Sequence, residues 1–228
     1  MQNDCSCELC KLRSLFFSHT STDVVKLMCE NKTEHQYDKG EIIIHEGSEI
    51  KDFTYLKSGL VKLSRKVTDG KDQIISFARP FDFVSLLSIF SSSTYNYTVT
   101  ALDETIICAI DLEKLKAVAL KNGEFTLGLM TRISEATDKI ILNNLDIRRK
   151  NLKGRIAHVI LYFANYIYKN NKFELPISRR EIAEYIGMTT ENVIRTMSEF
   201  RKDRILKFDG KEIEIVNEKL LETISEHG

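Results

Sequence analysis

The sequence lacks several features that would assign it to whole classes of protein. No apolar run approaches the length of a membrane-spanning helix, and the first residues do not resemble a signal peptide, so we expect a cytoplasmic protein with no membrane partner. It contains no Gly-x-Ser-x-Gly, phosphate-loop or His-Glu-x-x-His motif and no dense cluster of Asp, Glu and His, which argues against an enzyme. Its five cysteines, an odd number gathered mostly near the N-terminus, do not fit a secreted disulfide scaffold.

The chain also has no net charge, since 33 Lys and Arg balance 33 Asp and Glu. That total alone would argue against a nucleic-acid partner. However, residues 148–207 contain 14 Lys and Arg against 6 Asp and Glu, an excess of eight positive charges over a short stretch. This asymmetry favours double-stranded DNA as a partner. The phosphate contacts that it predicts are Arg148, Arg149, Lys150, Lys153, Arg155, Arg179, Arg180, Arg201, Lys202 and Arg204.

The most informative stretch is 179–198, which predicts a helix–turn–helix. Ala183 is small enough for two helices to cross closely at its position. Gly187, four residues later, supplies a sharp turn that most other residues would resist. Val193, six residues further on, supplies an apolar contact from the second helix to the first. The spacing of these three residues is that of a DNA-binding helix pair.

A capping box marks the start of this motif, because Ser178 is followed three residues later by Glu181. Helical periodicity then separates a buried face from an outward face. The buried face is predicted to contain Ile182, Ile186, Val193, Met197 and Phe200. The outward face, which would read DNA bases, is predicted to contain Thr189, Thr190, Glu191, Ile194, Arg195 and Ser198.

Residues 206–216 follow this helix pair and predict a small β-hairpin with Asp209-Gly210 as its two-residue turn. A helix–turn–helix closed by such a hairpin is a winged domain. We therefore assign residues 150–228 to a winged helix–turn–helix DNA-binding domain.

The first half of the chain has a different character. Short alternating or β-rich runs recur at intervals of roughly ten residues with glycines between them, which predicts a sandwich or jelly roll. We assign residues 21–123 to this domain, which would sense an effector, and 1–20 to a cysteine-containing segment. The predicted strands are 41–45, 53–56, 60–64, 73–77, 97–101 and 105–110.

A long helix is predicted over 124–149, between the two domains. Its apolar residues recur at spacings of four and three, as in a coiled-coil seam. A polar residue at Asn143 favours a homodimer, because it could meet its symmetry mate across the seam; the alternative is a helix that packs on its own domain. The predicted seam contains Leu129, Ile133, Ala136, Ile140, Asn143 and Ile147.

In this order of parts, the chain resembles the CRP/FNR family of bacterial transcription regulators. Residues 39–47 and 56–63 look like the family's glycine turns, and 187–198 looks like its DNA-reading segment. The resemblance implies an α+β fold with an N-terminal cyclic-nucleotide-binding-like β-roll, a dimerisation helix and a winged helix–turn–helix. It also implies a homodimer on palindromic sites that responds to an effector and contacts RNA polymerase.

The reading segment allows a more specific prediction. Glu191 can accept a hydrogen bond from cytosine N4, and Arg195 can donate two to guanine O6 and N7. They match the Glu and Arg with which the family reads a TGA step, whereas Thr190 stands where cyclic-AMP receptors carry another Arg. Ile194 could pack on a thymine methyl. A surface ion pair between Glu191 and Arg195 is the alternative for the free protein.

The effector is less clear from the sequence. Cyclic-nucleotide binders of the family use Gly-Glu for the ribose and an Arg for the phosphate, but segment 83–100 has Ser85-Leu86 and no Arg or Lys. A cyclic phosphate buried without a cation would be uncompensated, which argues against cyclic AMP. A cyclic-nucleotide-responsive regulator, or an adaptor that does not bind DNA, remains the alternative; Glu191 and Arg195 argue against the adaptor.

The cysteines suggest a different signal. The resemblance to oxygen-sensing FNR proteins implies a [4Fe–4S] cluster on three N-terminal cysteines and one in a late strand, which would be Cys5, Cys7, Cys10 and Cys108. The Cys-x-Cys-x2-Cys spacing is tighter than the family's pattern, which weakens this assignment. A zinc site, a thiol–disulfide switch and plain packing of Cys108 remain open. The cofactor is therefore unknown from the sequence.

Overall fold

The computed structural model describes residues 32–228 apart from 68–71, 81, 83 and 86–87, and all structural statements concern these residues. They pack as two units. Among the described residues, the first unit falls within 32–65 and 76–139, and the second falls within 66–75 and 140–228. In the described residues, no helix is both long and apolar enough to cross a membrane.

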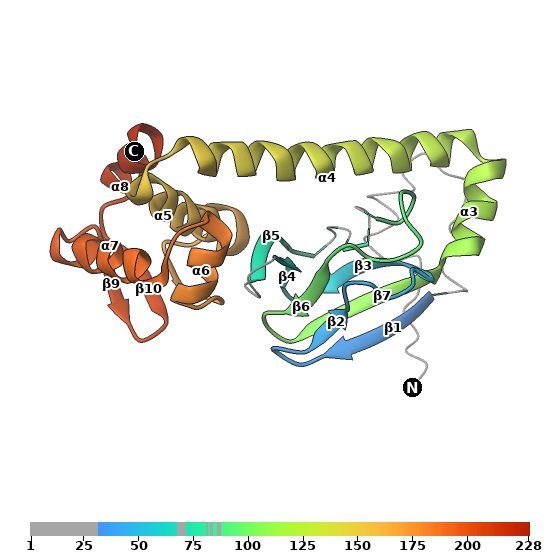
Figure 1. Ribbon diagram of the computed structural model, residues 1–228, viewed down its shortest axis with the longest axis horizontal. Helices are drawn as coiled ribbons and strands as arrows, with labels where there is room; N and C mark the ends of the chain where they lie inside the picture. The colour runs from blue at the N-terminus through green and yellow to red at the C-terminus, as the bar shows by residue number, and fades with distance from the viewer. Residues whose placement is uncertain (1–31, 68–71, 81, 83, 86–87) are drawn as a thin grey trace. The chain divides into compact units, whose positions relative to one another are not determined.

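Two antiparallel sheets form the first unit, as a jelly-roll-like domain requires (Figure 1). One sheet has the order β1-β7-β3 and the other has the order β2-β6-β4-β5. The strands are β1 (Lys32–Tyr37), β2 (Ile42–Ile44), β3 (Asp52–Ser58), β4 (Val61–Lys66), β5 (Asp72–Ala78), β6 (Thr98–Ala101) and β7 (Thr105–Asp111).

All six strands predicted in this half are present, as β2 to β7, within a few residues of their predicted bounds. Burial alternates along β6, whereas β3 and β7 each contain four consecutive buried residues. Leu56, Val61 and Val99 have no exposed surface. Gly59 turns the chain between β3 and β4 with a φ of 94°. A side chain there would also meet Thr105, since an added Cβ would lie 2.5 Å from its Oγ1.

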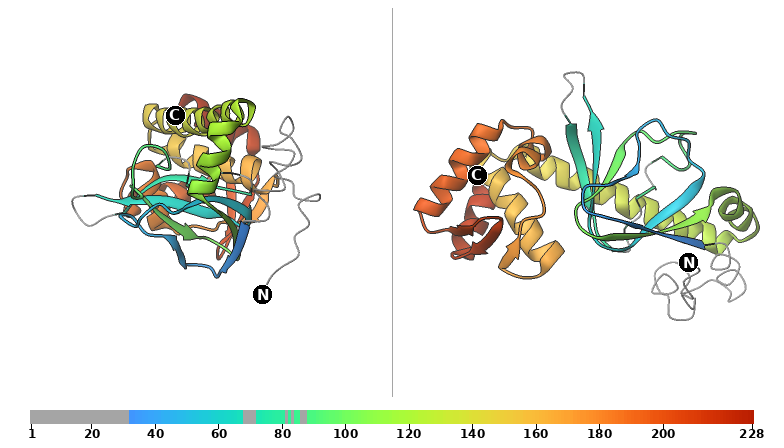
Figure 2. Two further views of the ribbon diagram at one scale, coloured as in Figure 1. Left: turned by 90° about the vertical axis from the view of Figure 1, so that its right-hand side faces the viewer. Right: turned by 90° about the horizontal axis from the view of Figure 1, so that it is seen from below.

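Two helices follow the sheets. The first is α3 (Leu112–Lys121), which begins with Asp111 accepting a hydrogen bond from the backbone N–H of Lys114. The second is α4 (Gly123–Arg149), the long helix that the sequence predicts over 124–149. It is a single uninterrupted helix, seen along its length in Figure 1 and from below in the right-hand view of Figure 2.

The second unit contains the winged helix–turn–helix. Its core is apolar and continuous, with Ile156, Phe163, Ile182 and Val193 fully buried. Its elements are α5 (Leu152–Leu161), the π-helical turn η1 (Tyr162–Tyr168), β8 (Lys172–Glu174), α6 (Arg179–Ile186), α7 (Thr190–Lys202), β9 (Leu206–Asp209), β10 (Glu212–Ile215) and α8 (Glu218–His227).

The wing differs from its prediction by one residue. Asp209 pairs with Glu212, so the two-residue turn is Gly210-Lys211 and not Asp209-Gly210. Burial sets this register, because Leu206, Ile213 and Ile215 must all face the core of the unit. Gly210 then occupies the first turn position with a φ of 59°, which glycine adopts without strain.

Candidate nucleic-acid interface

The helix–turn–helix is built as the sequence predicts. The hydroxyl of Ser178 accepts from the backbone N–H of Glu181 at 3.2 Å, and the Glu181 carboxylate accepts from the N–H of Ser178 at 2.8 Å. Both halves of the capping box are therefore formed. Gly187 ends α6 with a φ of 68°, and its N–H bonds to the carbonyl of Ala183. This left-handed residue turns the chain into the second helix.

The second helix, α7, separates its two faces cleanly. The predicted buried face lies in the core, since Ile182, Ile186, Val193, Met197 and Phe200 are all at most 3% exposed. Thr196, which the prediction leaves out, is buried beside them. The predicted outward residues Thr189, Glu191, Ile194, Arg195 and Ser198 are exposed, and Thr190 is half-buried.

Two of the outward residues are engaged with the helix itself. The Thr189 hydroxyl accepts from the backbone N–H of Asn192 at 3.3 Å, so Thr189 is the N-cap of α7. The Ser198 hydroxyl donates to the carbonyl of Ile194 at 2.9 Å. In this state their side chains stabilise α7, and a DNA base would have to compete for them.

Glu191 and Arg195 stand one helical turn apart on the exposed face of α7. The backbone N–H of Glu191 and the Thr189 hydroxyl lower the pKa of the Glu191 carboxyl, so it is ionised and can only accept hydrogen bonds. The guanidinium of Arg195 donates to Oδ1 of Asn192 at 2.9 Å. Asn192 therefore orients the guanidinium, a role that the sequence did not suggest.

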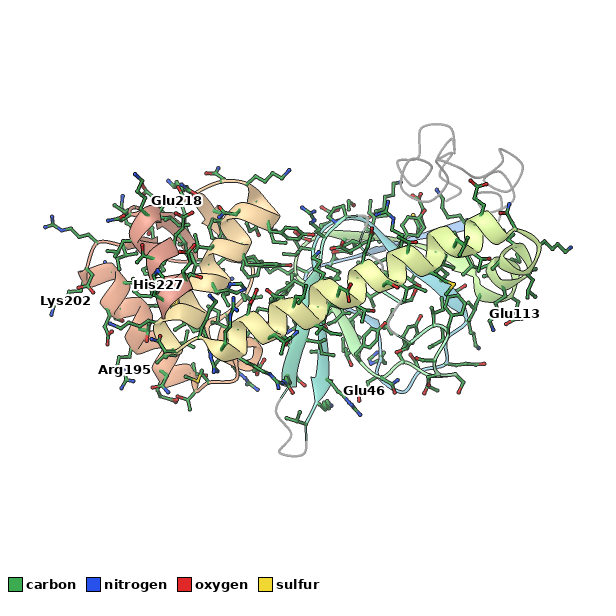
Figure 3. All side chains as sticks on the ribbon, turned by 90° about the horizontal axis from the view of Figure 1, so that it is seen from above. Glu46, Glu113, Arg195, Lys202, Glu218 and His227 are labelled. Atoms are coloured by element: carbon green, nitrogen blue, oxygen red, sulfur yellow. The ribbon has the colours of Figure 1, made fainter. Side chains whose placement is uncertain are left out.

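The predicted phosphate contacts fall into two groups. Arg148, Arg201, Lys202 and Arg204 are exposed, and Figure 3 shows Lys202 and Arg195 at the surface of the second unit. Three others are exposed but face a carboxylate within 2.9 Å. These ion pairs are Arg149 with Asp146, Lys153 with Glu199, and Arg180 with Glu184.

The remaining three side chains serve the fold. Arg179 stacks on the ring of Phe208 in the wing, with 5.3 Å between guanidinium carbon and ring centre. Lys150 is buried and donates to the carbonyl of Ser225. Arg155 donates to three backbone carbonyls. Lys150 and Arg155 were wrongly predicted as phosphate contacts, because charge alone does not reveal that a cation is already bonded to carbonyls.

Comparison with known proteins agrees with this architecture. A family model described as a cyclic nucleotide-binding domain matches residues 34–122, and one described as a Crp-like helix-turn-helix domain matches residues 154–224. The chain is a transcription regulator of the CRP/FNR family. This regulator binds DNA through its helix–turn–helix and has an N-terminal sensory domain; it belongs to no enzyme family.

Individual relatives cover nearly the whole chain. The transcriptional activator protein FnrA of Stutzerimonas stutzeri is 27% identical over 95% of this regulator and 91% of its own length. The fumarate and nitrate reduction regulatory protein of Salmonella typhimurium is 26% identical over 97% and 90%. The solved structure of FixK2 from Bradyrhizobium japonicum has a TM-score of 0.75, 25% identity and coverage of 85% and 96%.

The face of α4 predicted as a dimer seam packs within the single chain. Leu129 and Ile147 are each 3% exposed, and Ile133, Ala136, Ile140 and Asn143 are half-buried. A partner cannot reach Leu129 or Ile147, and the Asn143 amide bonds to Tyr185 and His158 of its own chain. The predicted seam is therefore wrong at these three residues. At 3.6 residues per turn, the opposite side of α4 carries another apolar row. Its members, each more than half exposed, are Leu127, Met130, Ile141, Leu142 and Leu145.

In the sensory domain, Ser85 is the first residue of the pair Ser85-Leu86, which stands in place of the Gly-Glu of cyclic-nucleotide binders. It is fully buried, and its hydroxyl bonds to the backbone N–H and carbonyl of Thr54 at 2.8 and 3.2 Å. Ser85 thus ties a loop to β3, and its buried hydroxyl has no donor left for a ribose. This bonding agrees with the absence of Arg and Lys from 83–100 in arguing against cyclic AMP.

Cys108 is the one predicted cluster ligand within the described residues, because Cys5, Cys7 and Cys10 lie outside them. It is 1% exposed in β7, and its thiol lies 3.7 Å from Glu34 Oε1. Burial raises the pKa of this thiol to about 11, so it is protonated at neutral pH. A bound metal would itself deprotonate a coordinating thiol, so the cluster stays a prediction.

Lysines surround the neighbouring carboxylate of Glu34. Lys57 Nζ lies 2.8 Å and Lys32 Nζ 3.0 Å from its two oxygens. Burial alone would raise the pKa of Glu34, but hydrogen bonds from Lys57 and Lys32 hold it below its ordinary value. A carboxylate compensated in this way keeps β1 bonded to β3 across the central strand β7.

Proposed function

We propose that this regulator binds as a homodimer to palindromic sites whose half-sites keep a TGA-like core, with α7 in the major groove. The observation that carries the proposal is the pair Glu191 and Arg195, exposed one turn apart on α7. An ionised carboxylate suits the N4 amino group of cytosine, and a guanidinium suits O6 and N7 of guanine. The two residues would therefore read adjacent base pairs.

Phosphate contacts would orient the helix in the groove. The exposed cations Arg148, Arg201, Lys202 and Arg204 are suited to this task, because no described carboxylate is paired with them. Each phosphate neutralised releases counterions, so affinity for every DNA sequence should fall as salt rises.

The second copy of the chain would dock on the exposed apolar row of α4. Leu127 and Met130 supply one apolar patch, and Ile141, Leu142 and Leu145 supply a second on the same side of the helix, which suits a parallel pair of helices. Two such chains would present two α7 helices to two half-sites. In the cytoplasm, a signal sensed by the first unit would control this binding and so the access of RNA polymerase to a promoter.

A titration of a labelled palindrome tests the proposal, with fluorescence anisotropy as the readout. Arg195→Ala should cost about 1–3 kcal/mol of specific binding and relax discrimination at one guanine. Lys202→Ala should weaken binding to all sequences alike and lower the slope of log K against log salt by about 0.9. If Arg195→Ala kept full discrimination among bases, the proposed docking of α7 would be wrong.

A further inference from the structure

Arg155, in α5, joins two helix ends of the second unit. Its Nε donates to the carbonyl of Lys150 at 2.8 Å and its Nη2 donates to the carbonyl of Arg148 at 3.0 Å. Its Nη1 donates to the carbonyl of Ile186 at 2.9 Å. Arg148 lies in the last turn of α4, Lys150 directly follows that helix, and Ile186 is the last residue of α6. Carbonyls at helix C-termini lack helical donors, so a guanidinium is well matched to them.

Asn143 makes a second connection between the same helices. Its Nδ2 donates to the hydroxyl of Tyr185 in α6 at 2.5 Å, and its Oδ1 lies 2.9 Å from Nε2 of His158 in α5. Because a carbonyl oxygen only accepts, Nε2 of His158 must carry the proton in this bond. Tyr185 is 5% exposed, so its bond with Asn143 lies in the interior of the unit, where losing a hydrogen bond is costly.

These two connections surround the turn of the reading motif. Ile186 immediately precedes Gly187, and α7 begins three residues after Gly187. On the other side, α4 from Ile140 onward belongs to the second unit and not to the first. The direction of the last turns of α4 and the direction of α7 are therefore coupled by side chains, in addition to the covalent chain.

We propose that Arg155, Asn143, His158 and Tyr185 are positioning residues that form a latch between α4 and the turn of the helix–turn–helix. Because of this latch, α7 and the end of α4 move as one body. The proposal rests on the proposed function, in which two α7 helices must meet two half-sites at a fixed spacing. Without the latch, only a fraction of molecules would present α7 in the competent direction, and the apparent affinity would fall by that fraction.

Substitution of Arg155 by Lys separates the latch from a phosphate contact, because it keeps the charge and loses the forked geometry. In the palindrome titration, Arg155→Lys and Tyr185→Phe should each weaken binding about tenfold with an unchanged salt slope. Arg132→Lys on α4 and Tyr168→Phe in η1 are the matched controls and should bind as wild type. Wild-type affinity in Arg155→Lys, or an Arg155→Met variant with a smaller salt slope, would overturn the latch.

Amide hydrogen exchange measures the latch without DNA. The backbone amides of Gly187 and Met188 both bond to the carbonyl of Ala183. In Arg155→Lys and Tyr185→Phe, these two amides should exchange about tenfold faster, while those of β10 stay protected. Unchanged exchange at both amides in both variants would overturn the proposal. The two proposals can therefore fail separately. A wild-type protein that does not bind the palindrome would refute the proposed function, and the exchange rates would still test the latch.

Discussion

The DNA-reading unit and the sensory unit differ in how far single residues reveal their task. In the reading unit, Glu191 and Arg195 are exposed on a helix whose other face is buried, and their chemistry names the bases that they can bind. In the sensory unit, the polar residues Ser85, Glu34 and Cys108 are instead bonded to their own fold. The polar groups of a recognition surface are exposed to solvent, whereas these polar groups of the β-roll are bonded within the fold.

The two faces of α4 pose the same comparison within one helix. The face toward the chain contains the seam predicted from sequence, and the opposite face contains an exposed apolar row. Both rows have helical spacing, so periodicity cannot tell which one packs on its own chain and which one meets a partner. Substitutions on either face can separate the two roles.

The largest effect is expected from Leu145→Glu in the exposed row. Like charges would face each other across the dimer seam, so sedimentation should give a folded monomer. Loss of the second half-site should then weaken palindrome binding by about 10²- to 10⁴-fold. Leu120→Glu, an 89% exposed leucine on α3, is the control and should leave the dimer intact. A dimeric Leu145→Glu protein would place the interface elsewhere.

The next effect distinguishes the glycine turns of the two units. Gly59→Ala should destabilise the first unit by about 3 kcal/mol, because it adds positive-φ strain and a clash with Thr105. Gly187→Ala has open space around the added methyl and should cost only the backbone strain of about 1–2 kcal/mol. Urea unfolding of both variants measures this difference. Equal losses would mean that the close approach at Gly59 is relieved by relaxation.

Apolar periodicity and turn residues predicted most of this fold. Strands β2 to β7, the capping box and Gly187 each have a local signal that tertiary contacts reinforce. Strand β1 was missed because Lys-Thr-Glu-His-Gln-Tyr has no apolar alternation; it is an edge strand whose buried side carries the ion-paired Lys32 and Glu34. Arg155 was misassigned because its carbonyl partners at residues 148, 150 and 186 are backbone groups, which a sequence does not distinguish.

A reactivity measurement tests the contrast between exposed and enclosed chemistry at Cys108. With its pKa raised to about 11 by burial, the thiol should be alkylated by iodoacetamide at least about a hundredfold more slowly than in urea-unfolded protein at pH 8. Mass spectrometry of the Cys108 peptide after a short pulse reports the rate. Equal rates in the folded and unfolded states would mean that this thiol is accessible and able to act as a ligand or redox group.

The smallest effect concerns His158 in the latch. Burial, the largest cause, together with Lys150 and Arg149 lowers its pKa, although Asp146 opposes them. The unfolded chain therefore binds a proton at a higher pH than the folded chain does, and stability rises with pH across that interval. The contribution of neutral His158 is complete above its ordinary pKa of 6.5 and is lost as pH falls toward the folded pKa.

His158→Gln keeps a donor for Asn143 and removes the titration, so its urea midpoint should fall less than that of wild type between about pH 7.5 and 5.5. His227→Gln, at the exposed end of α8, is the control and should follow wild type. Identical pH dependence in His158→Gln and wild type would mean that this imidazole titrates alike in the folded and unfolded chains.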